Sequence, residues 1–512
     1  MRLKRCTTTT TILQEDNCNI DRLTSLPLEL LICILSFLPT KDAAVACLSS
    51  KRMITHVFHS LTCLDFDDSP ICHCNTKPYA IKRFPTFVAF VDSVLLSYQS
   101  RYLTSFRLGV GPRFLSRYCH VSKHQYDDFQ PMEEQCKKGC YPELKSMHIN
   151  TWISFPLTFC GLMEIDLRVH VREEGDIQLP PEIFTCETLE VLKLDTNLGL
   201  HQASTLPSFR LPKLKLLSFH AAMIPDDDLV TRLVSSCPLL EDLTVVATWV
   251  HARFISISSP SVRRLYLEVW NIYEENYKTD FVLIHAPNLE YLHYNDNLAS
   301  HYIITKMDCL IEANLEIEAN DLEIEYEVSG QQKLSLLRPL SNVQHLIMID
   351  RFLEELNHEA VKDQLPVFHN LKRVELGYDE GRCWDKILLA FLNHSPALET
   401  IVFPQGLTSS PHDYRVDEED FASEQQFCRT VLANVPTCCK DHLKEIVVKD
   451  FNGYEREIDL IQFLLRHALV LEKLVMYPCC WANVDRMRVV ECTLQNLPKA
   501  SVTCSIQLVY MF

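Results

Sequence analysis

Hydrophobic residues near the start of the chain recur with the period of a helix. Six apolar side chains, at spacings of four, five, eight, nine and twelve residues from the first, share one broad helical face. Pro27 suits the first helical turn with Ser25 as its cap, and Pro39 ends the helix. Thr40 then caps a second predicted helix, Lys41 to Leu48. A hairpin this small is marginally stable alone, so another surface must cover its apolar face. That face consists of Leu26, Leu30, Leu31, Ile34, Leu35 and Leu38.

A second pattern dominates the rest of the chain. Apolar residues recur as triplets at i, i+3 and i+5, which one helical face cannot hold because i and i+5 lie about 140° apart. On a strand, i+3 and i+5 point to the same side. Six triplets start 27, 25, 26, 22 and 27 residues apart, close to the period of leucine-rich repeats. They are Leu162-Ile165-Leu167, Leu189-Leu192-Leu194, Leu214-Leu217-Phe219, Leu240-Leu243-Val245, Val262-Leu265-Leu267 and Leu289-Leu292-Tyr294.

The spacing of the triplets predicts an irregular solenoid of roughly a dozen turns. A strand of about six residues leaves some 15 to 20 for the return that parallel pairing requires. Pro212, Pro238, Pro260 and Pro287 each stand two places before a triplet, where they would break the return segment. Less regular triplets extend the pattern in both directions. These are Leu103-Phe106-Leu108, Leu144-Met147-Ile149, Leu310-Ala313-Leu315, Val343-Leu346-Met348, Leu371-Val374-Leu376, Leu398-Ile401-Phe403, Leu443-Ile446-Val448 and Leu471-Leu474-Met476.

Four segments depart from this pattern. Phe84 to Tyr98 is an amphipathic helix expected to cover the open end of the solenoid. Asp65 to Lys82 is a polar connector. Pro404 to Glu419 is a loop that interrupts the array, and Phe421 to Ala433 a helix that returns to it.

Composition narrows the possible partners. A chain of 512 residues with 47% hydrophobic and 23% charged residues can bury a sizeable core as several folding units or one elongated array. The net charge of −18 disfavours nucleic acid and anionic membranes as main partners and weakly favours a basic target. The apolar stretch 26–38 is too short to cross a bilayer and lacks the form of a secretory signal. We therefore expect an intracellular protein, in the nucleus or the cytoplasm.

The sequence offers little for metal, cofactor or catalysis. Its cysteine groups do not have the spacing of a zinc site, so loop or core cysteines are the expectation. No phosphate-binding or hydrolase motif occurs, and 11 glycines leave few places for a phosphate-cradling loop. The acidic strings Glu312–Glu327 and Asp417–Asp420 are typical of solvated faces. No catalytic residue, cofactor or metal ligand is predicted. The cysteine groups are Cys72-His73-Cys74, Cys136-Cys140, Cys438-Cys439 and Cys479-Cys480.

The N-terminal hairpin resembles the plant F-box over residues 21 to about 60. The resemblance implies a small helical domain that docks onto a Skp-type adaptor and, through it, onto a cullin scaffold. Met53 and Val57-Phe58 stand where the family usually has tryptophans, which would weaken adaptor affinity. The matching residues are Asp21-Arg22-Leu23, Leu26-Pro27, Glu29-Leu30-Leu31, Ile34 to Ala43 and Leu48 to Arg52. The adaptor-binding residues so implied are Leu26, Pro27, Leu30, Ile34, Leu35, Leu38 and Pro39.

The C-terminal part resembles the FBD module found at the end of many plant F-box proteins. The resemblance implies a strand, a turn, an amphipathic helix and a strand, as one more repeat-like unit that closes the array. The residues that carry it are Val435-Pro436, Cys438-Cys439, Leu443 to Ile446, Phe451-x-Gly453, Glu455 to Glu457, Leu460 to Ala468 and Leu471 to Leu474.

These patterns, with the two resemblances, predict an α/β protein in which a small all-helical F-box precedes an irregular leucine-rich-repeat solenoid closed by an FBD-type unit. We expect a non-enzymatic substrate-recognition subunit of a Skp–cullin–F-box ubiquitin ligase, whose repeats bind a protein target. Two alternatives stay open: a repeat scaffold that acts without an adaptor, and a hydrolase within the solenoid. The expected domains are a tail 1–20, the F-box 21–62, a connector 63–83, the solenoid 84–434 and the FBD-like end 435–512.

Overall fold

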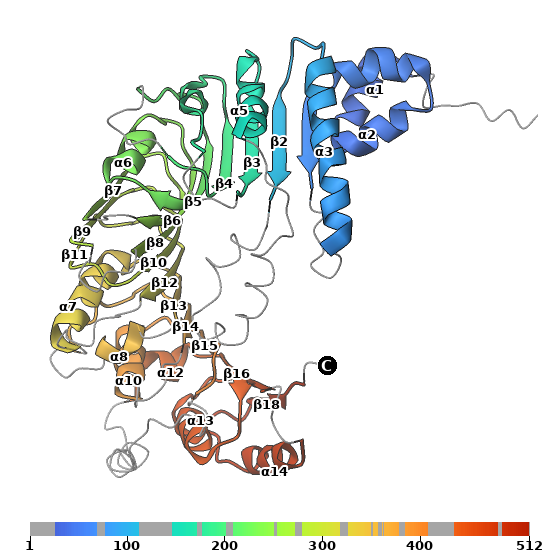
Figure 1. Ribbon diagram of the computed structural model, residues 1–512. Helices are drawn as coiled ribbons and strands as arrows, with labels where there is room; N and C mark the ends of the chain where they lie inside the picture. Colours follow the sequence, from blue (N-terminus) through green and yellow to red (C-terminus); the bar gives the residue numbers. More distant parts are fainter. Residues whose placement is uncertain are drawn as a thin grey trace, which may run out of the picture.

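One long parallel sheet dominates the computed structural model and follows the order of the chain (Figure 1). The predicted tail, Ser25, the helix Phe421–Ala433 and most of the loop Pro404–Glu419 lie outside the residues that the structure describes. The described residues are 26–68, 77–111, 146–171, 177–200, 208–249, 253–271, 279–317, 326–349, 352–356, 361, 363–377, 385–407, 435–479 and 484–510.

Within this part of the chain the main sheet has 15 strands, each paired in parallel with the next in the sheet. Figure 1 shows it bent into an arc, with the strands on the inner side. The strands are β1 (Cys63–Asp67), β2 (Ser105–Val110), β3 (Glu164–Val169), β4 (Val191–Thr196), β5 (Leu216–Ile224), β6 (Asp242–Trp249), β8 (Arg264–Asn271), β10 (Tyr291–Asp296), β12 (Glu312–Ile317), β13 (His345–Ile349), β14 (Arg373–Leu376), β15 (Thr400–Phe403), β16 (Glu445–Phe451), β17 (Lys473–Pro478) and β18 (Ser505–Leu508).

The predicted triplets explain the sheet. In β4, Leu192 and Leu194 point into the core, while the first triplet residue, Leu189, is buried just before the strand. Neighbouring strands keep the same register, so that equivalent residues stack; Ile165, for example, pairs with Leu192. The solenoid is thus confirmed, because the strands bury apolar side chains at equivalent positions in one continuous core.

One predicted triplet is wrong. Met147 and Ile149 lie in a helix, α5 (Ser146–Ser154), instead of a strand. Ile149, Trp152 and Ile153 are buried at the three- and four-residue spacing of a helix, and Met147 is exposed. Conversely, β1 was missed, although Leu61, Leu64 and Phe66 have the triplet spacing.

Helices cover the outer side of the arc (Figure 1). The amphipathic helix predicted at Phe84–Tyr98 is confirmed as part of α3 (Lys77–Ser97), but α3 forms the return from β1 to β2 instead of covering the end of the solenoid. The other helices are α6 (Asp228–Ser235), α7 (Tyr326–Leu337), α8 (Phe352–Leu356), α10 (Asp385–His394), α12 (Thr437–Asp441), α13 (Glu455–His467) and α14 (Val484–Gln495), with 3-10 turns at Pro156–Thr158, Pro181–Thr185 and Arg338–Leu340.

A second, three-stranded sheet replaces helices on the outer side of the middle coils (Figure 1). Its strands are β7 (Phe254–Ser258), β9 (Phe281–His285) and β11 (His301–Ile304), each of which follows a strand of the main sheet. Ile257 and Ile284 lie in register and are fully buried against the main core. The triplet pattern did not reveal this sheet, because these return strands carry a simple alternation of their own.

The N-terminal hairpin lies at the edge of the main sheet, beside β1. It comprises α1 (Leu28–Leu35), α2 (Thr40–Cys47), a short π-helix (Met53–Val57) and a 3-10 turn (Phe58–Ser60). The segment Asp65 to Lys82, expected to be a polar connector, contains the end of β1 and the start of α3. Because β1 begins three residues after the 3-10 turn, the hairpin passes into the first coil almost without a break.

The C-terminal unit continues the same sheet. Strands β16 and β17 flank α13, as the predicted strand–turn–helix–strand order requires. Gly453 has a φ of 72°, and a Cβ at this position would lie 2.8 Å from the Met487 side chain on α14, so the turn before α13 favours glycine. Glu457 is completely buried and accepts hydrogen bonds from the N–H groups of Asn452 and Tyr454. The carboxylate therefore fixes this turn.

We expect the stability of the C-terminal unit to fall between pH 5 and pH 7 because of Glu457. Burial outweighs its backbone hydrogen bonds and raises the pKa of this carboxyl to about 7, from an ordinary 4.5. The folded chain then holds a proton that the unfolded chain has lost, a difference of about 3 kcal/mol. Urea unfolding from pH 5 to 8, followed by the fluorescence of a probe on Cys492 in a chain whose other exposed cysteines are replaced by serine, should show this loss with Glu457 present and a flatter profile in Glu457→Gln. Equal pH profiles would contradict it.

Candidate functional site

The hairpin divides its apolar residues between two surfaces. Leu31 and Leu35, four residues apart on α1, point inward and pack with Met53 and Val57. Leu30 and Ile34, also four residues apart, lie on the outer surface of the same helix and are exposed. The hairpin thus has a core of its own and carries a second set of apolar side chains that nothing in the described chain covers.

The predicted adaptor-binding residues mostly lie on the outer surface. Pro27, Leu30, Ile34, Leu38 and Pro39 are exposed, Leu30 at 51%, and Leu26 is half-buried. Leu35, at 2% exposure, belongs to the hairpin core and lies beneath that surface, and its part in adaptor binding stays a prediction. The single broad face expected from the sequence is in reality two faces of one helix.

Three exposed apolar residues were missed by the sequence reasoning. Phe37 is 83% exposed in the turn between the helices, and Val45 and Leu48 lie on the outside of α2, with Leu48 at 72%. Their three-residue spacing on a helix with small inward residues, Ala43 and Cys47, would have revealed them. Together Leu30, Ile34, Phe37, Leu38, Val45 and Leu48 form what we call the outer hairpin surface.

The inner side of the arc offers a polar surface instead. Alternate side chains of each strand point away from the core, as the half-buried positions of β4 show. On the first coils these side chains form a chain of ion pairs: Arg107 lies 3.7 Å from Asp65 and 3.4 Å from Asp166, which in turn contacts Arg168 at 3.3 Å. These four side chains carry two negative and two positive charges, whereas the whole chain has a net charge of −18.

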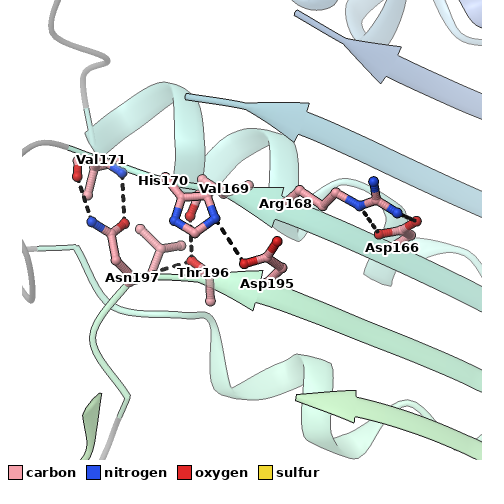
Figure 2. A network of polar contacts seen from close by, with 9 residues as sticks. Asp166, Arg168, Val169, His170, Val171, Asp195, Thr196 and Asn197 are labelled. Carbon is pink, nitrogen blue, oxygen red and sulfur yellow. Dashed lines mark hydrogen bonds and ion pairs between the residues drawn. The ribbon is translucent and has the colours of Figure 1, made fainter. Parts of the chain in front are cut away.

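A polar network continues at the ends of β3 and β4 (Figure 2). His170 Nε2 lies 3.0 Å from Asp195 Oδ1. Burial tends to raise the pKa of Asp195, but the hydrogen bond and charge of His170, with charges of His220 and Arg168, lower it overall. Asn197 bonds both the N–H and the C=O of Val171 in the preceding coil.

Close backbone packing accompanies this network. Gly111, after β2, has a φ of 106°, and a Cβ there would lie 2.0 Å from the carbonyl oxygen of His170. No other residue fits without moving the backbone. The network therefore locks consecutive coils together at their strand ends.

The histidine–aspartate pair of Figure 2 lacks the third component of a hydrolase. The hydroxyl of Thr196 donates to the carbonyl oxygen of Val169 at 2.6 Å and accepts from the N–H of Leu198. Among the described residues, no serine or cysteine side chain is bonded to His170. At this histidine–aspartate pair, the described residues therefore place no serine or cysteine nucleophile.

Comparison with known proteins identifies the family. Profiles described as an F-box domain, as the LRR repeats of FBD-associated F-box protein At5g56370, and as FBD match residues 23–60, 149–375 and 432–476, respectively. The F-box/LRR-repeat protein At4g14103 of Arabidopsis thaliana is 30% identical over 397 residues, which cover 76% of this chain and 92% of the relative. This chain belongs to the F-box/LRR-repeat family. Two further F-box/LRR-repeat proteins of that plant, At4g14096 and At3g59210, are 28% and 29% identical, and each alignment covers 96% of this chain and 95% of the relative.

Membership of this family confirms the resemblances found in the sequence. The F-box match coincides with the hairpin, and the FBD match includes α12, β16 and α13. The structure also shows what replaces the aromatic residues of the third F-box segment. Met53 and Val57 are fully buried in the hairpin core, so both stabilise the F-box by packing inside it.

The F-box/LRR chain shows no metal centre in its described part. No group of three or more histidine, cysteine, aspartate or glutamate side chains there is placed to hold an ion. Cys438 and Cys439 are buried, and Cys438 donates to the carbonyl oxygen of Leu392. The groups Cys72-His73-Cys74 and Cys136-Cys140 lie outside the described residues. Among the described helices, none is long and apolar enough to span a bilayer.

Proposed function

We propose that this chain is a substrate-recognition subunit of a Skp–cullin–F-box ubiquitin ligase. In this proposal the outer hairpin surface docks onto a Skp-type adaptor, and through it onto a cullin. One observation carries the proposal: six large apolar side chains are exposed on a hairpin whose own core is already filled. Exposed apolar side chains gathered on one small element are typical of a protein-docking surface.

The proposed role of the repeats is to hold a protein target. The inner surface spans many coils, and on the first of them acidic and basic side chains are paired, as at Arg107 with Asp65 and Arg168 with Asp166. Figure 1 shows the hairpin at one end of this arc, beyond the first strand. A target held on the arc would be kept close to a ubiquitin-carrying enzyme bound through the adaptor. The gain is in effective concentration, with no reaction step performed by the chain itself.

Adaptor binding is the decisive experiment. The full chain, co-expressed with a Skp-type adaptor, should elute as a one-to-one complex in size-exclusion chromatography with light scattering. In cells, proximity labelling with and without proteasome inhibition should then identify targets that accumulate under inhibition. A fluorescent fusion should appear in the nucleus or cytoplasm, where we place this activity.

An adaptor-independent scaffold is the second candidate. It is favoured by Met53 and Val57, which replace the usual aromatic residues of the third F-box segment. A chain that elutes alone with every Skp-type adaptor of its source organism, while it still captures repeat-dependent partners, would select this function over the first.

A further inference from the structure

The turn between the two F-box helices is tied at both ends to the start of the sheet, once at β1 and once at the residue before it. Ser36 Oγ accepts a hydrogen bond from the N–H of Thr62 at 3.1 Å. Thr40 Oγ1 accepts one from the N–H of Asp65, in β1, at 2.7 Å. Between these two ties Phe37 projects into solvent, 83% exposed. One five-residue turn therefore carries part of the outer hairpin surface and also the attachment to the repeats.

The bond from Asp65 to Thr40 satisfies a backbone N–H at the edge of the sheet formed by β1. Among the described strands β1 pairs with β2 alone, and alternate N–H groups of a parallel strand point to opposite edges. The N–H of Asp68 faces β2, where it donates to Gly109, so the N–H of Asp65 faces away from β2. The hydroxyl of Thr40 satisfies this N–H in place of a neighbouring strand. Thr40 was predicted to cap its own helix; instead it caps the edge of the sheet, and it is fully buried.

A second clamp holds the end of the F-box from the other side. The carbonyl oxygen of His59 accepts from the N–H groups of Gln99 and Ser100, which follow α3. The hydroxyl of Tyr98 donates to the carbonyl oxygen of Leu61 at 2.6 Å. The Tyr98 ring also packs edge-on against Phe155, close to the second return segment. The F-box is thus fixed between β1 and the first two coils.

We propose that Ser36 and Thr40 are positioning residues that set the orientation of the bound adaptor relative to the repeat sheet. This inference rests on the proposed function, because it assumes that the adaptor docks on the hairpin. Thr40 has no exposed surface with which to contact an adaptor, so it acts through the turn that it holds. The bound adaptor and a target on the inner surface would then lie at a fixed distance and angle from each other. If the turn were loosened, the adaptor would still dock, but this distance and angle would vary.

Hydrogen exchange on the free full-length protein tests the ties themselves. The variants are Thr40→Val, which keeps the shape of the buried side chain but removes the hydroxyl, Ser36→Ala, the two combined, and Thr40→Ser, which restores the hydroxyl. Ser49→Ala and Thr55→Ala are matched controls, because these hydroxyls bond backbone within the hairpin, at Ala46 and Lys51. We expect the amides of Thr62 and Asp65 to exchange about tenfold faster in the double variant, with protection retained in Thr40→Ser and both controls.

Adaptor binding then separates positioning from folding. We expect the double variant to bind a Skp-type adaptor within about threefold of wild-type affinity, while small-angle scattering of its complex shows a broader distance distribution. Unchanged exchange at Thr62 and Asp65, failure of Thr40→Ser to restore protection, or a tenfold loss of adaptor affinity parallel to the loss of protection would each overturn the proposal. If the wild type binds no adaptor, the proposed function fails instead, and the exchange data still decide whether the ties exist.

Discussion

Leu30→Asp should weaken adaptor binding at least about 100-fold while the chain stays folded. Leu30 is half-exposed on α1, and docking would bury it in an apolar contact. A carboxylate at this position would lose its water without gaining a partner, which costs several kcal/mol at the centre of an interface. The same substitution costs the free protein little, because a negative charge in the first turn of a helix is favourable. Calorimetric titration with a purified Skp-type adaptor, together with thermal unfolding of the free chain, measures both effects.

Two control variants identify the surface responsible. Val489→Asp places the same charge on an exposed residue of α14, in the C-terminal unit, and should bind the adaptor as the wild type does. Leu35→Asp puts it in the hairpin core and should lower the melting temperature together with binding. If Leu30→Asp binds normally, or if it loses only stability, the outer hairpin surface is not where an adaptor docks.

Asp296→Ala should destabilise the middle coils by about 4 kcal/mol. The side chain of Asp296 is buried at the end of β10, where its two oxygens accept from the hydroxyls of Tyr294 and Tyr302 and from the N–H of Leu298. Tyr302 belongs to β11, so this carboxylate joins the main sheet to the second sheet. Its removal leaves three buried donors without an acceptor, each costing about 1–3 kcal/mol.

Urea unfolding followed by circular dichroism, with native-state hydrogen exchange to locate the effect, checks this expectation. Tyr302→Phe removes one donor to Asp296 and also the acceptor of the Ala299 N–H, and should cost about 1–3 kcal/mol. Asp280→Ala, at an exposed aspartate beside β9, should change the unfolding midpoint little. A loss for Asp296→Ala as small as that for Asp280→Ala would show that the network does not hold the two sheets together.

The F-box and the repeats have separate sequence signatures, but in the structure the F-box leads directly into the sheet of the repeats. The main sheet begins immediately after the F-box and continues through the FBD unit to β18 without a change of strand direction. The FBD module thus adds coils to the array, and Glu457 fixes its turn from within. An adaptor at one end and a target along the arc would therefore be linked through a single continuous sheet (Figure 1).

Repeated spacing is what made most of this fold predictable. Each triplet, such as Leu189-Leu192-Leu194, specifies both a strand and the side it buries, and a fixed register copies this from coil to coil. The failure at Met147 arose because a helical face can contain part of the same spacing. The second sheet was missed because its strands alternate simply and lack the triplet, and their burial depends on the coils beneath them.

The sequence by itself determined the helical hairpin and the parallel coils, since each follows from the local spacing of apolar residues along one segment, and its resemblance to a known module indicated the FBD-type end. The tertiary structure alone decided which hairpin leucines face outward, because Leu30 and Leu31 are equally apolar and differ only in what lies beside them. It also decided the role of Thr40, whose hydroxyl meets an amide 25 residues further along the chain. Local patterns specify which side chains avoid water, whereas contacts between distant segments specify which of them are left facing it.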